Sequence, residues 1–209
     1  MTGIHKRIFL IFLLAAGLHS FVPANALAAS SDDARNFVND VGSKVLTIVN
    51  ASGDEAGKKQ QLQQMFSQYV DIPWMGRFVL GHSWQEATPD QRNHYLQAYK
   101  NYLLARYTTN FANYNGSKYI ITGARDEGDG TFTVDMKIKT PQQSQDTLAG
   151  YRLAYENGQF KIHDIVIEGV SLITTQRSEF ASVVQREGMD GLIKDIENKT
   201  QAKQASSHS

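Results

Sequence analysis

The sequence predicts an α+β fold in which helices at both ends of the chain flank an antiparallel meander of four strands. Three observations lead to this prediction. Apolar residues recur at helical spacing over about 31–114, alternate with polar residues over 118–167, and return to helical spacing over 174–198. Short turn signals separate the alternating stretches, so each strand should pair with the next. A doubly wound sheet, in which strands and helices alternate along the chain, does not fit this order.

The first part of the domain carries start and stop signals for three helices. Ser31 is the expected N-cap of the first, which should end near residues 51–53. A second helix, with a narrower apolar stripe, is expected over about 55–69. Asp71 is the expected N-cap of a third, short helix, and Gly81 is its expected C-terminal stop.

A fourth and longer helix has the clearest start signal in the chain. Thr88 and Gln91 form a capping box around Pro89, which suits the first helical position, and the helix should run to about Tyr114. Its apolar face is too broad for a single neighbour, so it must contact both a sheet and other helices, or line a cavity. This face comprises Tyr95, Leu96, Tyr99, Tyr102, Leu103, Tyr107 and Phe111.

The middle of the chain has the two-residue period of half-buried strands. The clearest case is 131–139, where four apolar residues alternate with polar ones and predict a strand with one wet face. The segment 128–130 should turn the chain into this strand, and Asn157-Gly158 is the strongest signal for a type I′ hairpin. The expected strands lie near residues 119–123, 131–139, 151–155 and 160–167.

We place the domain at residues 29–199. Residues 1–28 resemble a cleavable signal peptide, with a short basic start, an apolar run too short for a membrane span, and the cleavage pattern Ala26-Leu27-Ala28. An N-terminal membrane anchor is the alternative. At the other end, two helices are expected over 174–186 and 189–198, and the small polar residues 200–209 should form a disordered tail.

The amino-acid composition argues against several classes of function. The chain has 21 Lys plus Arg and 21 Asp plus Glu, and loss of Lys6 and Arg7 with the signal peptide leaves 19 against 21, a net charge of −2. Nucleic-acid binders usually carry a basic excess, so no nucleic-acid partner is expected. The chain has no cysteine, which excludes disulfides, iron–sulfur clusters, thiolate zinc sites and a cysteine nucleophile. An exported chain without disulfides suits a bacterial periplasm.

The residues do not assemble into a recognisable catalytic or metal site. His82, His94 and His163 lack the spacing of metal ligands. His163 and Asp164 are adjacent on an expected strand, so their side chains should point to opposite faces, and His163 should be partly exposed. Ser171 lacks the second glycine of a nucleophile elbow. We therefore expect no catalytic residue and no metal, while a hydrolase with a hidden site stays an alternative.

Aromatic residues are the distinctive feature of the expected domain. Five of the nine tyrosines fall between Tyr95 and Tyr114. They fit either an ordinary aromatic core or the wall of a cavity, where tyrosine can border an apolar ligand while its hydroxyl meets a polar head. Arg106 follows Tyr102 by four residues and is either a surface arginine or a headgroup contact at the cavity mouth.

Two parts of the sequence form long ordered motifs. The first is DIPWMGRFVLGHSW at 71–84, followed by ATPDQR at 87–92. The second comprises YRL at 151–153, FKIHDIVIEGVSL at 160–172, RSEF at 177–180 and GMDGLI at 188–193. Together these segments resemble the MlaC or toluene-tolerance family, the periplasmic lipid-binding components of the Mla phospholipid transport system. The resemblance extends over about residues 34–199.

This resemblance implies a curved antiparallel sheet of about four strands packed against several helices and enclosing an apolar lipid pocket. It implies a periplasmic carrier that moves phospholipid between an outer-membrane lipoprotein complex and an inner-membrane ABC transporter complex with an MCE-domain protein, and so maintains outer-membrane lipid asymmetry. Phospholipid would be cargo, and no cofactor is implied. A sister branch accompanies hopanoid biosynthesis, so a hopanoid binder is an alternative. Phe160 and Gln176 depart from the family pattern, and Gln176 would alter one edge of the pocket or a partner surface.

A two-chain lipid needs a volume of about 1,000 Å³, at the upper end of ordinary ligand pockets, so the pocket should lie between layers of the fold. Arg77 and Arg106 are candidate contacts for the lipid phosphate. The candidates for the pocket wall, chosen by the side to which they should face, are Trp74, Phe78, Tyr99, Leu103, Tyr107, Phe111, Val134, Met136, Ile138, Tyr151, Leu153 and Ile165.

Overall fold

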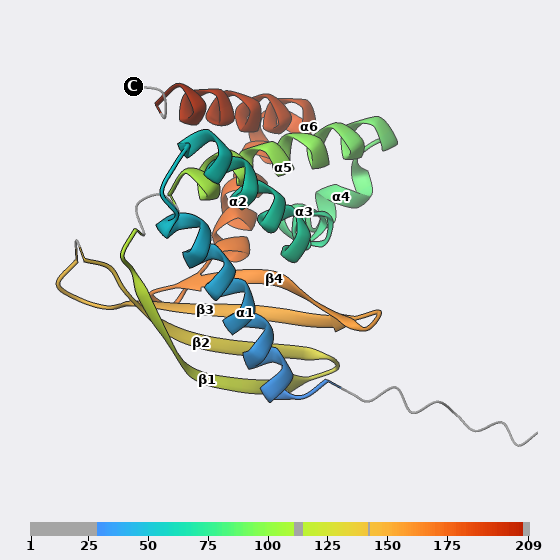
Figure 1. The fold of residues 1–209 in the computed structure, drawn as a ribbon. Coiled ribbons are helices and arrows are strands. Elements are labelled where there is room, and N and C mark those ends of the chain that lie inside the picture. Colours follow the sequence, from blue (N-terminus) through green and yellow to red (C-terminus); the bar gives the residue numbers. More distant parts are fainter. Residues whose placement is uncertain (1–28, 111–114, 142, 207–209) are drawn as a thin grey trace, which may run out of the picture.

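The computed structural model describes residues 29–110, 115–141 and 143–206. The expected signal peptide at 1–28, the expected end of the long helix at 111–114, and residues 207–209 lie outside this part of the chain. Within it, six helices pack on a five-stranded antiparallel sheet, which confirms the α+β fold (Figure 1).

The sheet is an open meander in which each strand pairs with the next along the chain. The first strand is longer than expected, because its polar second half pairs with the following strand across two register irregularities. The expected turn and hairpin are present: Asn157 and Gly158 both have positive φ, at 52° and 80°. A short fifth strand was not expected. The strands are β1 (Lys118–Gly128), β2 (Thr131–Lys139), β3 (Thr147–Glu156), β4 (Gln159–Ile167) and β5 (Val170–Ser171).

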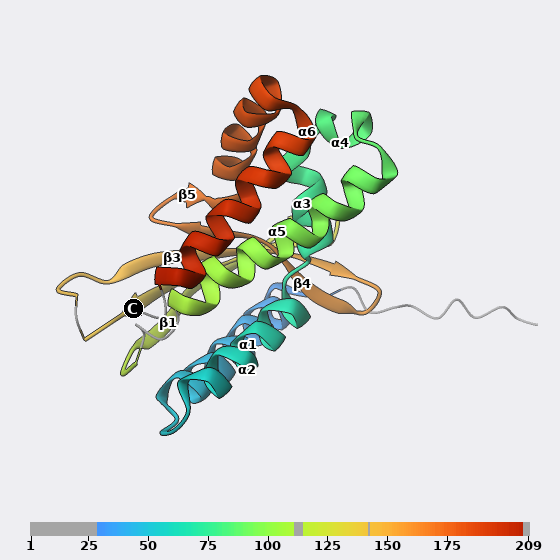
Figure 2. The ribbon, with the colours of Figure 1, turned by 90° about the horizontal axis from the view of Figure 1, so that it is seen from above.

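The helices cover one face of the sheet and extend beyond it. The first helix crosses the face of the first two strands with the second helix beside it, and the two longest helices after them pack against each other (Figure 2). The short helix after Gly81 was not expected. The helices are α1 (Ser31–Asn50), α2 (Glu55–Tyr69), α3 (Ile72–Leu80), α4 (His82–Glu86), α5 (Pro89–Asn110) and α6 (Leu172–Ser206).

Local capping chemistry explains where most helices begin. The Thr88 hydroxyl accepts the backbone N–H of Gln91 at 3.2 Å while the Gln91 side chain accepts that of Thr88 at 3.1 Å, which confirms the capping box. The assignment of Ser31 as the N-cap of α1 is wrong by one residue. Ser30 caps instead, because Asp33 stands three residues after it and accepts its backbone N–H at 2.9 Å.

The last helix corrects one prediction and confirms another. Gly188, with φ 72° and ψ −176°, kinks α6 between the two helical segments that the sequence predicts. The helix then continues through Ser206, so the expectation of a disordered tail is wrong for residues 200–206. Thr200 is buried there and its hydroxyl donates to the carbonyl of Ile196 at 2.8 Å, which ties this segment to the domain.

The aromatic face of α5 belongs mainly to a core shared with α3 and α6. Tyr95 and Tyr99 are fully buried, and both rings meet Phe180 edge-on, with centroids 6.5 and 6.0 Å apart. The Tyr99 hydroxyl donates to the Gln176 side-chain oxygen at 2.5 Å. Gln176 is 3% exposed, so it lies inside this helical core and not at a pocket edge or a partner surface.

Candidate functional site

An apolar cavity of about 330 Å³ lies between α1, α2 and the inner face of the sheet. Its helical side comes from valine and leucine of α1 and from larger side chains of α2. Its sheet side comes from residues of β1, β2, β3 and β4. Side chains on a strand point to the two faces in turn, and a register irregularity at His163 brings both Ile162 and Ile165 of β4 to the cavity. The lining includes Val38, Val41, Val45, Leu46, Leu62, Met65, Phe66, Tyr69, Tyr107, Tyr119, Met136, Ile138, Tyr151, Ile162, Ile165 and Ile167.

Tyrosine hydroxyls connect this apolar cavity to polar groups at its margin. Lys44 donates to the Tyr69 hydroxyl at 3.0 Å, and the Tyr119 hydroxyl donates to the backbone carbonyl of Asn39 at 2.8 Å. The Arg106 guanidinium lies 6.0 Å from the centre of the Tyr107 ring. Burial raises the pKa of Tyr107 above its ordinary value although Arg106 opposes the shift, so its phenol stays neutral. The cavity therefore has an apolar interior and a margin with cations and neutral hydroxyls.

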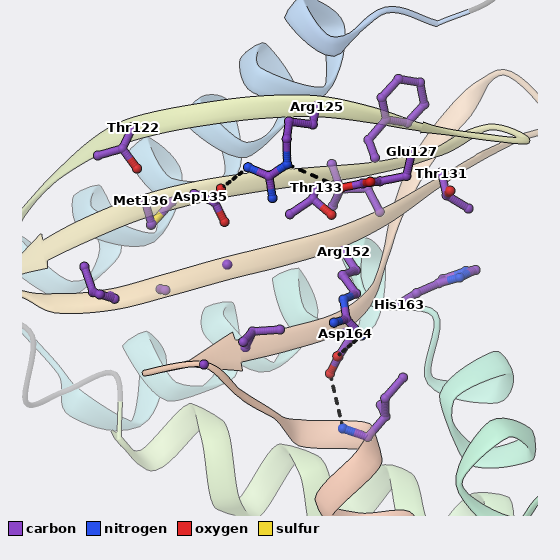
Figure 3. Close-up of a pocket in the computed structure, with 18 of the residues that line it drawn as sticks. Thr122, Arg125, Glu127, Thr131, Thr133, Asp135, Met136, Arg152, His163 and Asp164 are labelled. Carbon is purple, nitrogen blue, oxygen red and sulfur yellow. Dashed lines mark hydrogen bonds and ion pairs between the residues drawn. The ribbon is translucent and has the colours of Figure 1, made fainter.

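A larger cavity of about 840 Å³ lies over the opposite, polar face of the sheet (Figure 3). Arg125 pairs with Asp135 at 2.5 Å across its floor, and Arg152 lies 3.4 Å from Asp164. Trp74 and Phe78 of α3 form an aromatic wall at one side. Its charges are paired within the site, and acyl chains would have to cover these ion pairs and remove their water.

Asp164 and His163 have structural partners and do not form a catalytic pair. Asp164 is fully buried, and its carboxylate accepts the Ser171 hydroxyl at 2.6 Å and the backbone N–H of Ile173 at 3.2 Å, which anchors the start of α6. His163 stacks on Trp74 with ring centroids 3.9 Å apart. The expectation that His163 is partly exposed is wrong, because α3 covers this part of β4 and leaves the residue 8% exposed.

The predicted wall residues divide between the two cavities and the core. Tyr107, Met136, Ile138, Tyr151 and Ile165 line the apolar cavity. Trp74, Phe78 and Leu153 line the larger cavity, to which Met136 also contributes. Tyr99, Leu103 and Val134 are fully buried and line neither cavity. Phe111 lies outside the described residues. Arg77 and Arg106 are exposed and line neither cavity.

The helical side of the apolar cavity was missed in the sequence. Val38, Val41 and Val45 recur at helical spacing, but this pattern is the same for a helix that packs tightly and for one that borders a cavity. One signal was available: Gly42 interrupts this stripe, where a small residue leaves room for a neighbour. A Cβ at Gly42 would lie 2.9 Å from the ring of Tyr119, which occupies that room.

Neither a metal centre nor a membrane span is present in the part of the chain that the structure describes. No group of three or more histidine, aspartate and glutamate side chains there is placed to hold a metal ion. None of its helices is both long and apolar enough to cross a membrane.

Comparisons with known proteins agree on one family. The family model for MlaC protein matches residues 39–198. The intermembrane phospholipid transport system binding protein MlaC of Haemophilus influenzae is 22% identical over 129 residues, 60% of each chain. Toluene tolerance protein ttg2D of Pseudomonas putida is 24% identical over 130 residues, 62% of this chain and 60% of that protein. The matched regions thus span about three fifths of each relative's length.

A solved structure shows the same fold. The phospholipid-binding protein from Ralstonia solanacearum, determined in complex with a phospholipid, superposes with a TM-score of 0.72 at 22% identity. The match covers 82% of this chain and 98% of that one. Since the family model covers most of the domain, we conclude that this chain belongs to the MlaC family.

Proposed function

We propose that this protein is a periplasmic phospholipid carrier that holds acyl chains in the apolar cavity between α1, α2 and the sheet. The observation that carries the proposal is the cavity itself, whose lining is almost entirely aliphatic and aromatic and whose margin carries cations. The relatives named for phospholipid transport and phospholipid binding support the choice of ligand.

The energetics of lipid transfer require such a cavity. Each methylene moved from water to an apolar site is worth about 0.8 kcal/mol, so two acyl chains of roughly 30 methylenes account for on the order of 20 kcal/mol. Free lipid therefore crosses water too slowly to be useful. An apolar wall that replaces the bilayer makes loading nearly neutral and hence reversible.

The cavity must widen to accept a two-chain lipid. Its volume of about 330 Å³ is well below the roughly 1,000 Å³ that such a ligand needs. The α1–α2 pair can move away from the sheet without disturbing the aromatic core, because that core is formed by α5 and α6. We propose that lipid entry moves α1 and α2 away from the sheet.

The lipid headgroup should lie at the cation-bearing margin of the cavity. Arg106 stays our candidate for the phosphate because it lies over Tyr107, whereas Arg77 lies on α3 beside the larger cavity. We propose that the carrier exchanges lipid with an inner-membrane ABC transporter complex bearing an MCE-domain protein and with an outer-membrane lipoprotein complex, and so maintains outer-membrane lipid asymmetry. The role needs no cofactor and no chemical step.

Native mass spectrometry of the purified domain, followed by extraction and identification of the ligand, tests the proposal. We expect a bound diacyl phospholipid. Val45→Asp places a charge in the cavity wall from a half-buried position on α1, so we expect the folded variant to lose most of its lipid. Val184→Asp is the matched control, since Val184 is half-buried on α6 and lines neither cavity.

The outcomes separate the candidate ligands. A polycyclic triterpenoid in the extract would indicate a hopanoid binder in place of a phospholipid carrier. An empty wild-type protein that takes no lipid from vesicles would refute the carrier. Circular dichroism must show that each variant is folded. Leu103 is unsuitable for this test because it is fully buried in the helical core, where a charge would unfold the protein.

A further inference from the structure

The four exposed large hydrophobic side chains of the described residues all lie at one end of the sheet. Ile120 is 70% exposed, Val170 61%, Leu148 48% and Ile167 41%. They stand near the start of β1 and β3, at the end of β4 and in β5. The starts of β1 and β3 and the end of β4 lie at the left end of the sheet in Figure 1, and β5 pairs with the end of β4. Isolated exposed apolar residues are normal, but their concentration at one place marks an interaction surface.

Three lysines share this end of the sheet. Lys118 lies directly opposite Lys139, and Lys137 lies between Ile120 of β1 and Leu148 of β3. Residues opposite each other on neighbouring strands share a face, so the lysines and these two apolar side chains form one continuous outer surface. Ile167 lies opposite Ala149 and Val170 lies opposite Ile167, so these two side chains belong to the cavity face of the sheet and meet the outer surface only at its end. We call Ile120, Leu148, Ile167 and Val170 with these three lysines the end patch, which wraps around the end of the sheet.

The positive charge of the end patch is not neutralised within the protein. None of its lysines makes an ion pair with any described residue, and two like charges directly opposite each other are unfavourable. Glu168 lies beside the patch, and its carboxylate accepts the backbone N–H of Leu148 at 2.7 Å. Asp146 is exposed two residues before Leu148. A net positive, partly apolar surface remains, and its repulsion would be relieved by an anionic partner.

The end patch adjoins the apolar cavity. Lys118 and Ile167 belong to the patch and also line that cavity. A surface that combines unpaired lysines with exposed aliphatic side chains matches a membrane interface, where cations meet lipid phosphates and apolar side chains enter the headgroup region.

We propose that the end patch docks this protein on an anionic membrane surface, with the cavity next to the bilayer from which lipid enters. The docking surface rests on the proposed carrier function for its purpose, but it is a separate property of the molecule. Each lysine near an anionic surface raises affinity about fivefold, so binding should be strongest at low salt.

Flotation with phospholipid vesicles tests the docking surface. One set contains equal parts of phosphatidylglycerol and phosphatidylethanolamine, and the other contains phosphatidylcholine alone. We expect wild-type protein to bind the anionic vesicles and to be released by salt. Lys137→Glu with Lys139→Glu should lower affinity for them at least tenfold, from about fivefold per lysine. Lys100→Glu with Lys194→Glu makes the same change in net charge on exposed residues of α5 and α6 and should retain binding.

A second variant tests the apolar part of the surface. Ile120→Ser removes the most exposed aliphatic side chain without altering charge, and we expect weaker binding to the anionic vesicles with unchanged folding by circular dichroism. Equal loss of binding in the end-patch and control lysine variants would overturn the proposal, because overall charge would then explain the effect. So would unchanged vesicle binding in the end-patch variants, which would leave this surface to a protein partner.

Lipid content, measured on the same samples by native mass spectrometry, separates this proposal from the carrier function. Wild-type protein that carries lipid but does not float with anionic vesicles refutes the docking surface and leaves the carrier intact. Protein that floats through the end patch but never carries lipid refutes the carrier and leaves the docking surface intact.

Discussion

His163 lies between an aromatic ring and a carboxylate in the interior of the domain. Its ring stacks on Trp74, and its Nε2 atom lies 3.7 Å from the Asp71 carboxylate, too far for a hydrogen bond. Burial lowers the pKa of His163 below its ordinary value of 6.5, with a smaller contribution from Arg77. Asp71 and Glu156 oppose this shift without reversing it. The folded protein therefore favours the neutral imidazole.

The lowered pKa predicts acid sensitivity of the fold. Between the folded-state pKa of His163 and about 6.5, the unfolded chain binds more protons than the folded protein, so stability is lost as pH falls through this interval. His163→Phe keeps the stacking on Trp74 and removes the titration. We expect the melting temperature of this variant, followed by circular dichroism, to fall less than that of wild type between about pH 7 and pH 5.

His82 is exposed on α4 and provides a control for the titration of His163. His82→Phe changes a histidine whose side chain is 80% exposed, so the variant should keep the wild-type pH profile. Parallel profiles for wild type and His163→Phe would show that His163 does not contribute to the acid sensitivity.

Gly42 lets α1 approach the ring of Tyr119 on β1 closely. This residue lines the apolar cavity, and the Tyr119 ring occupies the space beside it. Gly42→Leu should fill part of the cavity and displace Tyr119, so we expect bound lipid to fall several-fold in native mass spectra. Leucine also gains about 1 kcal/mol over glycine in helix propensity, which offsets part of the steric cost and favours a folded variant.

The same helix supplies the control. Thr47→Leu adds a side chain of the same size at an exposed position of α1 that does not line the cavity, so this variant should keep its lipid. If a folded Gly42→Leu protein carries as much lipid as Thr47→Leu, the space between α1 and the sheet is not the binding site.

Helix starts and hairpins were predictable because neighbouring residues determine them. Thr88 and Gln91 bond to each other, and the turn at Asn157-Gly158 needs positive φ at both positions. In contrast, β5 has only two residues and exists because Ser171 and Val170 pair with the end of β4. Such elements depend on distant contacts, which a local pattern does not contain.

The candidate site was predictable on the sheet side and not on the helical side. The alternation of apolar and polar residues predicted that Met136, Ile138, Tyr151 and Ile165 share one face of the sheet. In the structure all four side chains lie on the face that borders the apolar cavity. For the aromatic helix α5, the sequence allowed both a core and a cavity wall, and spacing alone does not tell which neighbour covers each residue. Phe180 of α6 covers Tyr99, whereas Tyr107 remains at the cavity.

The molecule thus has two parts: a helical core, and a cavity between the first two helices and the sheet. The aromatic core of α3, α5 and α6 is closely packed, whereas α1 and α2 border the apolar cavity of about 330 Å³. Acyl chains that enter this cavity would add dispersion contacts with the side chains that line it. Lipid should therefore stabilise the fold and not only occupy it.

Lipid-dependent stability can be measured directly. A ligand that binds only the folded protein stabilises it by about 2.7 kcal/mol at a concentration 100-fold above its dissociation constant. For a domain of this size each kcal/mol raises the melting temperature by about 2–4 °C, so reloading delipidated protein should raise it by about 5–10 °C. Gly42→Leu should show a smaller response, because leucine takes up part of the cavity and the variant binds less lipid. Equal melting temperatures for lipid-free and loaded wild type, with loading verified by native mass spectrometry, would contradict binding in this cavity, since the cavity exists only in the folded protein.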